Sequence, residues 1–166
     1  YCRSGTPRGC GLVLRRRLLR MTDRTRVLFI CTHNSARSQM AEGLLRALGG
    51  AGYDVHSAGT EATAVRPLAI EAMAELGIDI SAQESKTLER YLPEQWDYVI
   101  TVCDDANEAC PFFPGGRVRD HWSFEDPSKA TGTPDEQLAV YRRVRDEIAA
   151  RVRQLIATTN EQAPAI

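Results

Sequence analysis

The sequence predicts an α/β domain with a parallel sheet. Short apolar runs, typical of strands buried on both faces, alternate along the chain with segments whose apolar residues recur at helical spacing. The 166 residues, of which 43% are hydrophobic and 26% charged, are enough for one domain with a substantial core. No apolar run approaches the roughly 20 residues that cross a bilayer, so we expect one globular domain and no membrane partner.

Four segments are expected to be strands. Residues 26–31 read Arg-Val-Leu-Phe-Ile-Cys, a continuous apolar run that fits a strand covered on both faces. Residues 53–57 and 98–102 are a second and a third strand, and residues 118–122 are a candidate fourth. Because helical segments separate these strands, the sheet is expected to be parallel.

Two helices are expected in the first half of the chain. The first begins at Arg37 and ends at the Gly49-Gly50 pair, since glycine commonly stops a helix. The second begins near Pro67, because proline fits the first helical turn. Their apolar residues are Met40, Ala41, Leu44, Leu45 and Leu48 in the first helix and Leu68, Ile70, Met73 and Leu76 in the second.

The last helix has the clearest signals. Thr133 can cap its N-terminus, Pro134 fits its first position, and Glu136 is placed for a capping box. One apolar face is then expected to pack on the domain. It consists of Leu138, Tyr141, Val144, Ile148, Val152 and Leu155.

Much of the basic charge lies in the first 20 residues. The net charge is −1, from 21 basic and 22 acidic residues. Six arginines and no acidic residue fall in residues 1–20, so residues 21–166 hold 15 basic and 22 acidic residues, a charge of −7. This balance favours no nucleic-acid partner. We expect residues 1–20 to be a disordered extension without function, ahead of a natural start at Met21, and residues 21–166 to form the domain.

Five cysteines form an odd and sparse set, unlike the disulfide framework of a small secreted protein. A cytoplasmic protein with reactive thiols fits better. Cys2 and Cys10 fall in the extension, which leaves Cys31, Cys103 and Cys110 as candidates for chemistry.

The strongest motif is the segment 31–37, called here the anion cradle. Cys31 ends the first strand, five small or polar residues follow, and Arg37 opens a helix. Backbone N–H groups of such a loop and the helix dipole favour an anion, Arg37 can hold two of its oxygens, and the same field favours the thiolate of Cys31. Ser38 is placed to donate to the sulfur. The oxyanion-binding loop consists of Thr32, His33, Asn34, Ser35, Ala36 and Arg37.

Within this loop, Asn34 can adopt the left-handed backbone conformation or tie the loop down through its amide. A lone cysteine at a strand end is more often an inert buried residue. The complete order of strand, cysteine, polar loop, arginine, serine and helix favours the functional interpretation.

Cys103 and Cys110 follow the third strand and are separated by six residues. If that strand is parallel to the first, Cys103 lies near Cys31 at the edge of the sheet where ligands bind. Three thiols then allow disulfide exchange in series. Two inert cysteines or two zinc ligands are the alternatives, but zinc sites usually have four ligands at tighter spacing. The three histidines show no ligand spacing either, so no metal site is expected.

Asp126 and Pro127 follow the fourth strand. A carboxylic acid that reaches into the anion cradle could protonate a departing oxygen. An ordinary turn is the alternative, because Asp-Pro is common in turns.

Together these motifs resemble the thioredoxin-coupled arsenate reductases, which share the fold of the low-molecular-weight protein-tyrosine phosphatases. The resemblance runs from about Arg26 to the last helix and implies a single three-layer domain with a four-stranded parallel sheet. Its densest stretches are residues 31–42, 57–59, 78–81, 103–111, 121–127 and 144–148.

The resemblance also implies a mechanism. Cys31 would attack arsenic, Arg37 would hold the arsenate oxygens and Asp126 would protonate the departing oxygen. Cys103 would then attack Cys31 and release arsenite. Cys110 would finally attack Cys103, leaving a disulfide for thioredoxin, the expected electron donor, to reduce.

Some members of this family hold a potassium ion beside the catalytic loop. The corresponding residues here are Asn34, Glu42, Ser57 and Lys86, the last of which replaces an aspartate. A lysine ammonium would supply its own cation near Glu42. We therefore expect no cofactor and no potassium requirement.

Two other functions stay open. A low-molecular-weight tyrosine phosphatase would use the same cradle and Asp126, but it would leave Cys103 and Cys110 without a task. Such phosphatases also commonly carry two tyrosines after the Asp-Pro, where Ser128 and Lys129 stand here. A non-catalytic oxyanion-binding or redox-sensing module is the third option. The first interpretation predicts a cytoplasmic monomer that binds arsenate and thioredoxin, with weak phosphatase side activity.

Overall fold

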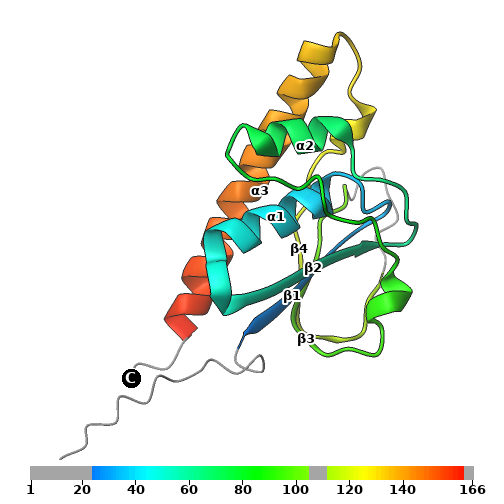
Figure 1. The fold of residues 1–166 in the computed structure, drawn as a ribbon. Helices are drawn as coiled ribbons and strands as arrows, with labels where there is room; N and C mark the ends of the chain where they lie inside the picture. Colours follow the sequence, from blue (N-terminus) through cyan, green and yellow to red (C-terminus); the bar gives the residue numbers. More distant parts are fainter. Residues whose placement is uncertain (1–23, 105–111, 163–166) are drawn as a thin grey trace, which may run out of the picture.

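A computed structural model describes residues 24–104 and 112–162. Its four strands form one parallel sheet, as predicted, and their order is β2-β1-β3-β4 (Figure 1). From β1 the chain continues to β2 on one side of β1, and it then crosses to β3 on the opposite side of β1. The strands are β1 (Thr25–Cys31), β2 (Tyr53–Gly59), β3 (Trp96–Thr101) and β4 (Gly116–His121). The N-terminal extension and Cys110 lie outside the described residues.

Three helices accompany the sheet, and each begins where its sequence signals predict. They are α1 (Arg37–Gly49), α2 (Pro67–Ala74) and α3 (Pro134–Gln162). Gly50 caps α1 at its C-terminus with φ 64°, and Pro67 stands in the first turn of α2. Thr133 Oγ1 accepts a hydrogen bond from Glu136 N at 3.2 Å, half of the predicted capping box. Short 3₁₀ turns are η2 (Gly50–Gly52), η3 (Leu88–Tyr91) and η4 (Pro127–Lys129).

Several predicted boundaries differ by one or two residues. The largest error concerns Leu76, which was predicted on the apolar face of the second helix. The helix ends at Ala74, and Leu76 is 46% exposed. Gly77 has φ 74° and its N–H bonds to Ala74 O, so a turn closes at this point and Leu76 faces away from the core.

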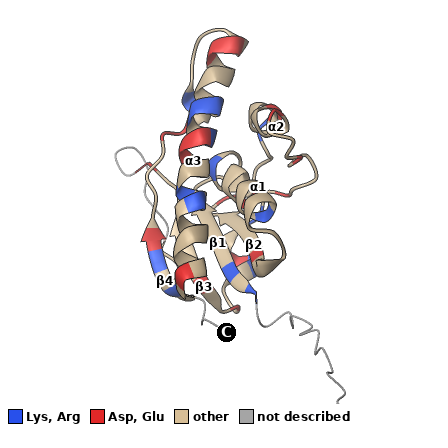
Figure 2. Ribbon diagram, turned by 90° about the vertical axis from the view of Figure 1, so that its left-hand side faces the viewer, with Lys and Arg blue, Asp and Glu red and all other residues tan. Residues whose placement is uncertain are grey.

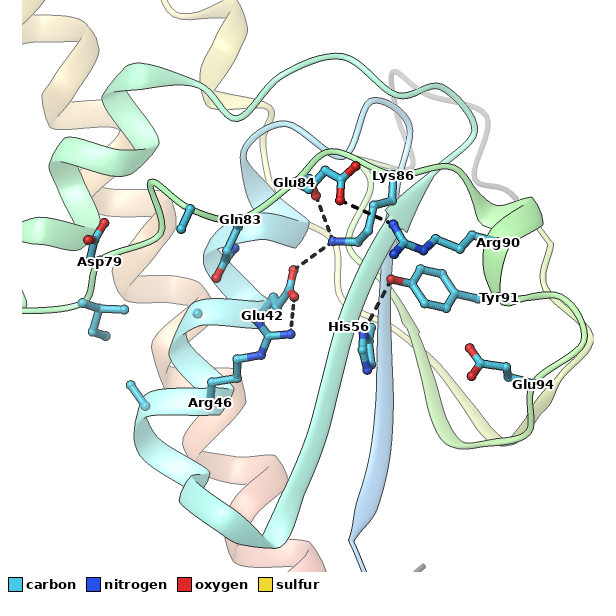
Figure 3. Close-up of a pocket in the computed structure, with 14 residues that line it drawn as sticks. Glu42, Arg46, His56, Asp79, Gln83, Glu84, Lys86, Arg90, Tyr91 and Glu94 are labelled. Atoms are coloured by element: carbon cyan, nitrogen blue, oxygen red, sulfur yellow. Dashed lines mark hydrogen bonds and ion pairs between the residues drawn. The ribbon is translucent and has the colours of Figure 1, made fainter. Parts of the chain in front are cut away.

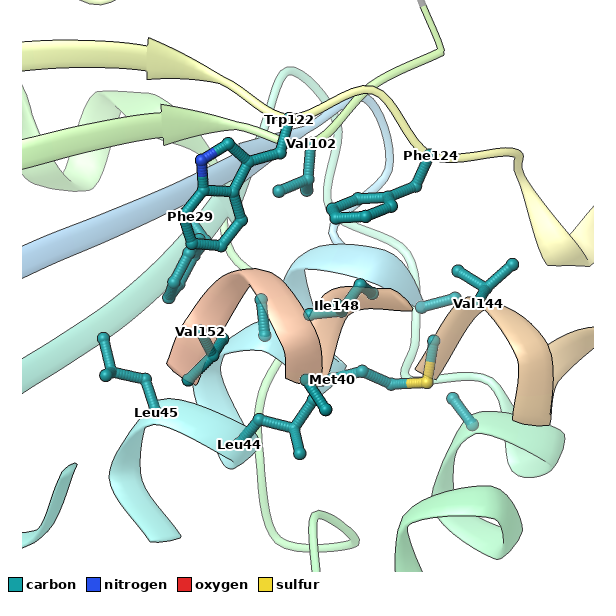
Figure 4. Close-up of a cluster of buried hydrophobic side chains, with 14 of the residues drawn as sticks. Phe29, Met40, Leu44, Leu45, Val102, Trp122, Phe124, Val144, Ile148 and Val152 are labelled. Atoms are coloured by element: carbon teal, nitrogen blue, oxygen red, sulfur yellow. The ribbon is translucent and has the colours of Figure 1, made fainter. Parts of the chain in front are cut away.

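The two faces of the sheet are covered differently. Alternate β1 residues point to opposite faces. Val27 and Phe29 pack against the three helices, in a cluster to which α3 contributes every predicted apolar residue (Figure 4). Leu28 and Ile30 pack on the other face against Trp96, Tyr91 of η3, and a loop residue, Phe113.

Charged residues of both signs are interspersed along α3 and on β4 (Figure 2). Within residues 24–104 and 112–162, no helix is both long enough and apolar enough to cross a membrane.

Candidate active site

Cys31 lies at the point where the chain reverses its direction across the sheet. It is the last residue of β1, whose neighbours β2 and β3 are reached by connections running to opposite sides. In open parallel sheets, such a point at the carboxyl ends of the strands leaves a crevice for a ligand. The fold therefore places the predicted nucleophile where a substrate can be bound.

Asn34 shapes the anion cradle in both of the predicted ways. It has a left-handed backbone with φ 47°, and its side-chain amide donates to Ser38 Oγ at 2.8 Å and to Ser57 Oγ at 2.9 Å. The loop thus turns back on itself before α1 begins at Arg37.

Two hydrogen-bonding groups contact the Cys31 sulfur. Ser38 Oγ lies 2.9 Å from Cys31 Sγ, and the backbone N–H of Asn34 donates to the same sulfur at 3.2 Å. Cys31 is buried, and both contacts come from the loop and the first turn of the helix that follow it. This arrangement suits a thiolate nucleophile.

Three supports of the anion cradle come from segments to which the sequence analysis assigned no such role. Gln39 Nε2 donates to Asn34 O at 3.0 Å and to Asn34 Oδ1 at 2.9 Å, and the backbone N–H of Lys86 donates to the same Oδ1 at 2.8 Å. A Cβ atom on Gly59 would come within 2.7 Å of Thr32 O. Gly59 lies two residues past the predicted strand 53–57, and the only signal for it was its place in the stretch 57–59 of the family resemblance.

Arg37 joins the anion cradle to the segment that carries Asp126. Its guanidinium is buried, donates from Nη1 to Phe124 O at 3.1 Å, and places Nη2 3.6 Å from Asp126 Oδ2. Asp126 Oδ1 accepts from Ser128 N at 2.9 Å and from Ser128 Oγ at 2.7 Å, so the carboxylate also caps η4. The predicted general acid therefore lies beside the predicted anion-binding arginine.

Cys103 follows β3, the strand that pairs with β1, and its side chain approaches the end of β1 where Cys31 lies. Ile30 is opposite Thr101 in the β1–β3 register, and Val102 N donates to Ile30 O at 2.8 Å. Cys103 Sγ is 3.9 Å from the same carbonyl. Cys31 and Cys103 are both buried, and they lie at the carboxyl ends of the adjacent strands β1 and β3.

His33 lies at the mouth of the anion cradle. Its Nδ1 is 3.4 Å from Glu61 Oε2, and both side chains are substantially exposed. The backbone carbonyl of His33 accepts from Thr63 Oγ1 and Ser85 Oγ, each at 3.2 Å. Within the described ranges, no three His, Cys, Asp or Glu side chains are grouped closely enough to hold a metal ion.

Behind the anion cradle, a cavity of about 870 Å³ opens between α1, β2 and the segment 78–94 (Figure 3). Glu42 is almost fully buried at its wall and contacts two cations. Arg46 Nη2 lies 2.7 Å from Glu42 Oε1, and Lys86 Nζ lies 3.8 Å from Glu42 Oε2. Burial lowers the pKa of Lys86, and Glu42 acts in the opposite direction.

This fold, with a Cys-x5-Arg loop at the end of its first strand, defines a phosphatase-like α/β domain. The low molecular weight phosphotyrosine protein phosphatase family matches residues 26–165, and the chain belongs to that family.

Within the family, the chain is similar to arsenate reductases. It is 49% identical to the arsenate reductase of Halalkalibacterium halodurans, over 80% of this chain and 95% of that protein. A solved arsenate reductase in the phosphate-binding state has 39% identity and a TM-score of 0.68, covering 81% of this chain and 98% of its own. A thioredoxin-dependent arsenate reductase of Corynebacterium glutamicum has 30% identity and a TM-score of 0.61, covering 86% of this chain and 65% of its own.

Proposed function

We propose that this protein reduces arsenate to arsenite, with Cys31 as nucleophile and a Cys31-Cys103-Cys110 disulfide relay that thioredoxin recycles. One observation carries the proposal: a second buried thiol, Cys103, follows the strand paired with the one that ends at Cys31. A phosphatase needs only the first thiol. Two-electron reduction of arsenate is matched by a pair of thiols, because a dithiol gives up two electrons when it is oxidised to a disulfide.

In the first step, the Cys31 thiolate attacks arsenic while Arg37 and the loop hold the arsenate oxygens. A sulfur–arsenic bond forms and an arsenic–oxygen bond breaks. The departing oxygen takes a proton from Asp126 and leaves as water. The 3.6 Å contact between Arg37 and Asp126 supports this pairing of anion holder and acid.

In the second step, the Cys103 thiolate attacks the Cys31 sulfur. A Cys31–Cys103 disulfide forms, the sulfur–arsenic bond breaks, and its electron pair stays on arsenic, which leaves as arsenite. Cys110 then attacks Cys103, so that Cys31 is freed and the disulfide moves to Cys103–Cys110. Cys110 lies outside the described residues, so its part rests on the sequence and the resemblance that its motif carries.

Thioredoxin is the proposed electron donor, because an internal dithiol needs no added thiol to release the arsenic adduct. The thioredoxin dependence of the Corynebacterium glutamicum enzyme supports it. We further propose that the chain works as a monomer in the cytoplasm, where thiols stay reduced. Turnover with thioredoxin and thioredoxin reductase, and none with glutathione and glutaredoxin, is the expected result.

We also propose that no potassium ion is required. Lys86 Nζ donates to Glu84 O at 2.8 Å and faces Glu42 Oε2. An ammonium group at this place repels a second cation and contacts the carboxylate that a potassium ion would need. The residues present therefore do not fit a potassium site.

The test is to incubate the reduced protein with arsenate, quench it with acid, and map disulfides by mass spectrometry. We expect one Cys103–Cys110 bond for each arsenite released. The Cys110→Ser variant should stop after one turnover with a Cys31–Cys103 bond, and its full multiple-turnover activity would refute the relay. A Cys2→Ser, Cys10→Ser double variant is the control and should behave as the wild type.

The same reaction mixture separates the alternative functions. Efficient hydrolysis of an aryl phosphate without any thiol oxidation would make the protein a tyrosine phosphatase. Oxyanion binding without turnover of either compound would make it a binding module. Weak aryl phosphate hydrolysis beside fast arsenate reduction is expected, since the anion cradle suits both anions.

A further inference from the structure

A continuous chain of hydrogen bonds connects the Cys31 sulfur to the surface cavity behind the anion cradle. Cys31 Sγ contacts Ser38 Oγ at 2.9 Å, and Asn34 Nδ2 contacts both Ser38 Oγ at 2.8 Å and Ser57 Oγ at 2.9 Å. Ser57 Oγ in turn donates to Glu42 Oε2 at 2.5 Å. All five side chains are buried, so bulk water does not interrupt the chain.

The direction of these bonds is set at Asn34. Its Oδ1 accepts from the Lys86 backbone N–H and from Gln39 Nε2, so its NH₂ group must face the two serines. Each amide hydrogen is then given to one serine. Asn34 is thereby fixed as a donor toward both Ser38 and Ser57.

Because both serine hydroxyls accept from Asn34, each can donate its own hydrogen to a further partner. Ser57 accepts from Asn34 and gives its own hydrogen to the Glu42 carboxylate. Ser38 likewise accepts from Asn34, which favours giving its hydrogen to Cys31 Sγ. At the far end Glu42 can only accept, because a carboxylate has no hydrogen to give, so Glu42 holds the Ser57 hydroxyl in the place where it accepts from Asn34.

Arg46 secures that end of the chain. Arg46 follows Glu42 by one turn of α1, and its Nη2 lies 2.7 Å from Glu42 Oε1 (Figure 3). The same Nη2 also donates to Val55 O at 2.6 Å. Lys86 Nζ lies 3.8 Å from Glu42 Oε2, which is beyond hydrogen-bond distance. Lys86 Nζ donates instead to Glu84 O. A guanidinium does not lose its charge in proteins, so Arg46 is the constant partner of this carboxylate.

We propose that Arg46 is a positioning residue for Cys31: its ion pair with Glu42 fixes the carboxylate that holds Ser57, and Ser57 in turn holds the Asn34 amide that orders Ser38 beside the sulfur. The Arg46 side chain contacts Glu42 and Val55, not the anion cradle itself, and it is 46% exposed. This inference rests on the proposed role of Cys31 as nucleophile.

The test measures how fast iodoacetamide alkylates Cys31 in the reduced full-length protein at neutral pH, with peptide mapping to isolate this site. Arg46→Gln is expected to slow alkylation about fivefold, the effect of one hydrogen bond of ordinary strength. Arg46→Lys should restore most of the rate. In arsenate turnover, Arg46→Gln should lower kcat and leave KM unchanged, because Arg46 does not contact the anion.

Arg90→Gln is the matched control. Arg90 lines the same cavity and pairs with Glu84 at 3.5 Å, and no contact links it to Glu42. Its loss should leave the alkylation rate unchanged. If Arg90→Gln slowed alkylation as much as Arg46→Gln, the total positive charge around the cavity, and not the contact with Glu42, would set the alkylation rate, and the proposal would be wrong.

A second variant tests the chain itself. Ser57→Ala removes the middle link and should slow alkylation as much as Arg46→Gln does. The double variant should be no slower than either single variant, because both act through one path. Independent, multiplying effects, or a wild-type rate in folded Arg46→Gln, would overturn the proposal. Since alkylation needs no arsenate, a failure of the reductase assay would leave this result interpretable.

Discussion

Ser38 Oγ lies 2.9 Å from Cys31 Sγ, and both side chains are buried. Removal of this hydroxyl takes one contact from the sulfur and one acceptor from Asn34 Nδ2, while the Arg37 guanidinium keeps its partners. We expect Ser38→Ala to lower kcat for arsenate about tenfold, since hydrogen bonds to charged groups are worth about 1.5–3 kcal/mol and part of this is replaced by water. Steady-state kinetics and Cys31 alkylation should change together, with KM unaffected.

Ser81→Ala is the control for this prediction, because Ser81 lies in an exposed turn where its backbone N–H donates to Asp79 Oδ1. It should have wild-type kinetics. A Ser38→Ala variant with wild-type kcat and alkylation would show that the contact does not activate the sulfur.

Gly59 has no room for a side chain. A Cβ atom would lie 2.7 Å from Thr32 O, 2.8 Å from Asn34 N and 2.9 Å from Cys31 O, all of them backbone atoms of the anion cradle. Gly59→Ala should therefore displace the cradle, lower the free energy of unfolding by about 1–3 kcal/mol and reduce activity strongly. Urea unfolding and arsenate turnover measure the two effects.

Gly52 offers a matched comparison, because nothing lies within 4 Å of the Cβ atom that alanine would add there. Gly52→Ala should change neither quantity by much. Equal activity of the two variants would contradict the close contact at Gly59.

These contacts explain which parts of the site were predictable. Cys31, Arg37 and Ser38 lie in one strand–loop–helix segment, so local spacing alone placed them together. The parallel sheet then accounts for Cys103, because residues at the carboxyl ends of neighbouring strands share one edge. In both cases a local pattern and a simple topology were sufficient.

The supports of the loop were not predictable in this way. Gly59 and the backbone N–H of Lys86 reach the cradle from distant segments, and only the three-dimensional path of the chain brings them there. Strand lengths depend on partners as well: β3 begins at Trp96 because Gly116 pairs with it on β4. Neither relationship leaves a periodic signal in the sequence.

Lys86 should make the protein indifferent to potassium. Its ammonium lies 3.8 Å from Glu42 Oε2, where we propose that it takes the place of a bound cation. Arsenate turnover is expected to be equal in potassium and sodium chloride at matched ionic strength. Lys86→Asp brings a second carboxylate beside Glu42, so this variant should gain a several-fold preference for potassium. A several-fold potassium effect on the wild type would show that Lys86 does not replace the ion.

Tyr91 should make stability fall at high pH. Burial raises the pKa of Tyr91 from its ordinary value of 10.0 to about 12. Between these values the unfolded chain releases the phenol proton while the folded chain keeps it, so the free energy of unfolding decreases as the pH rises through this window. Below pH 10 both states keep the proton and the contribution is complete.

Tyr91→Phe should flatten this decrease, as measured by urea unfolding across pH 10 to 12. Tyr98→Phe is the comparison, because the Tyr98 hydroxyl donates to Gln162 at the exposed surface. A decrease of the same slope in Tyr91→Phe and the wild type would assign the alkaline loss of stability to other groups.

Asp126 combines a structural and a proposed chemical role, and two substitutions separate them. Its Oδ1 caps η4 through Ser128, while Oδ2 faces Arg37 at 3.6 Å. Asp126→Asn keeps an acceptor for the cap but has no acid proton to give. We expect it to retain the wild-type Tm and to lose about 100-fold in kcat for arsenate, a typical effect of removing a general acid.

Asp126→Ala should lose the same activity and also part of the stability, about 1 kcal/mol, because the cap is gone. Thermal unfolding and single-turnover arsenite release measure the two roles separately. If Asp126→Asn released arsenite at the wild-type rate, the proton would have to come from another donor and Asp126 would be only a cap.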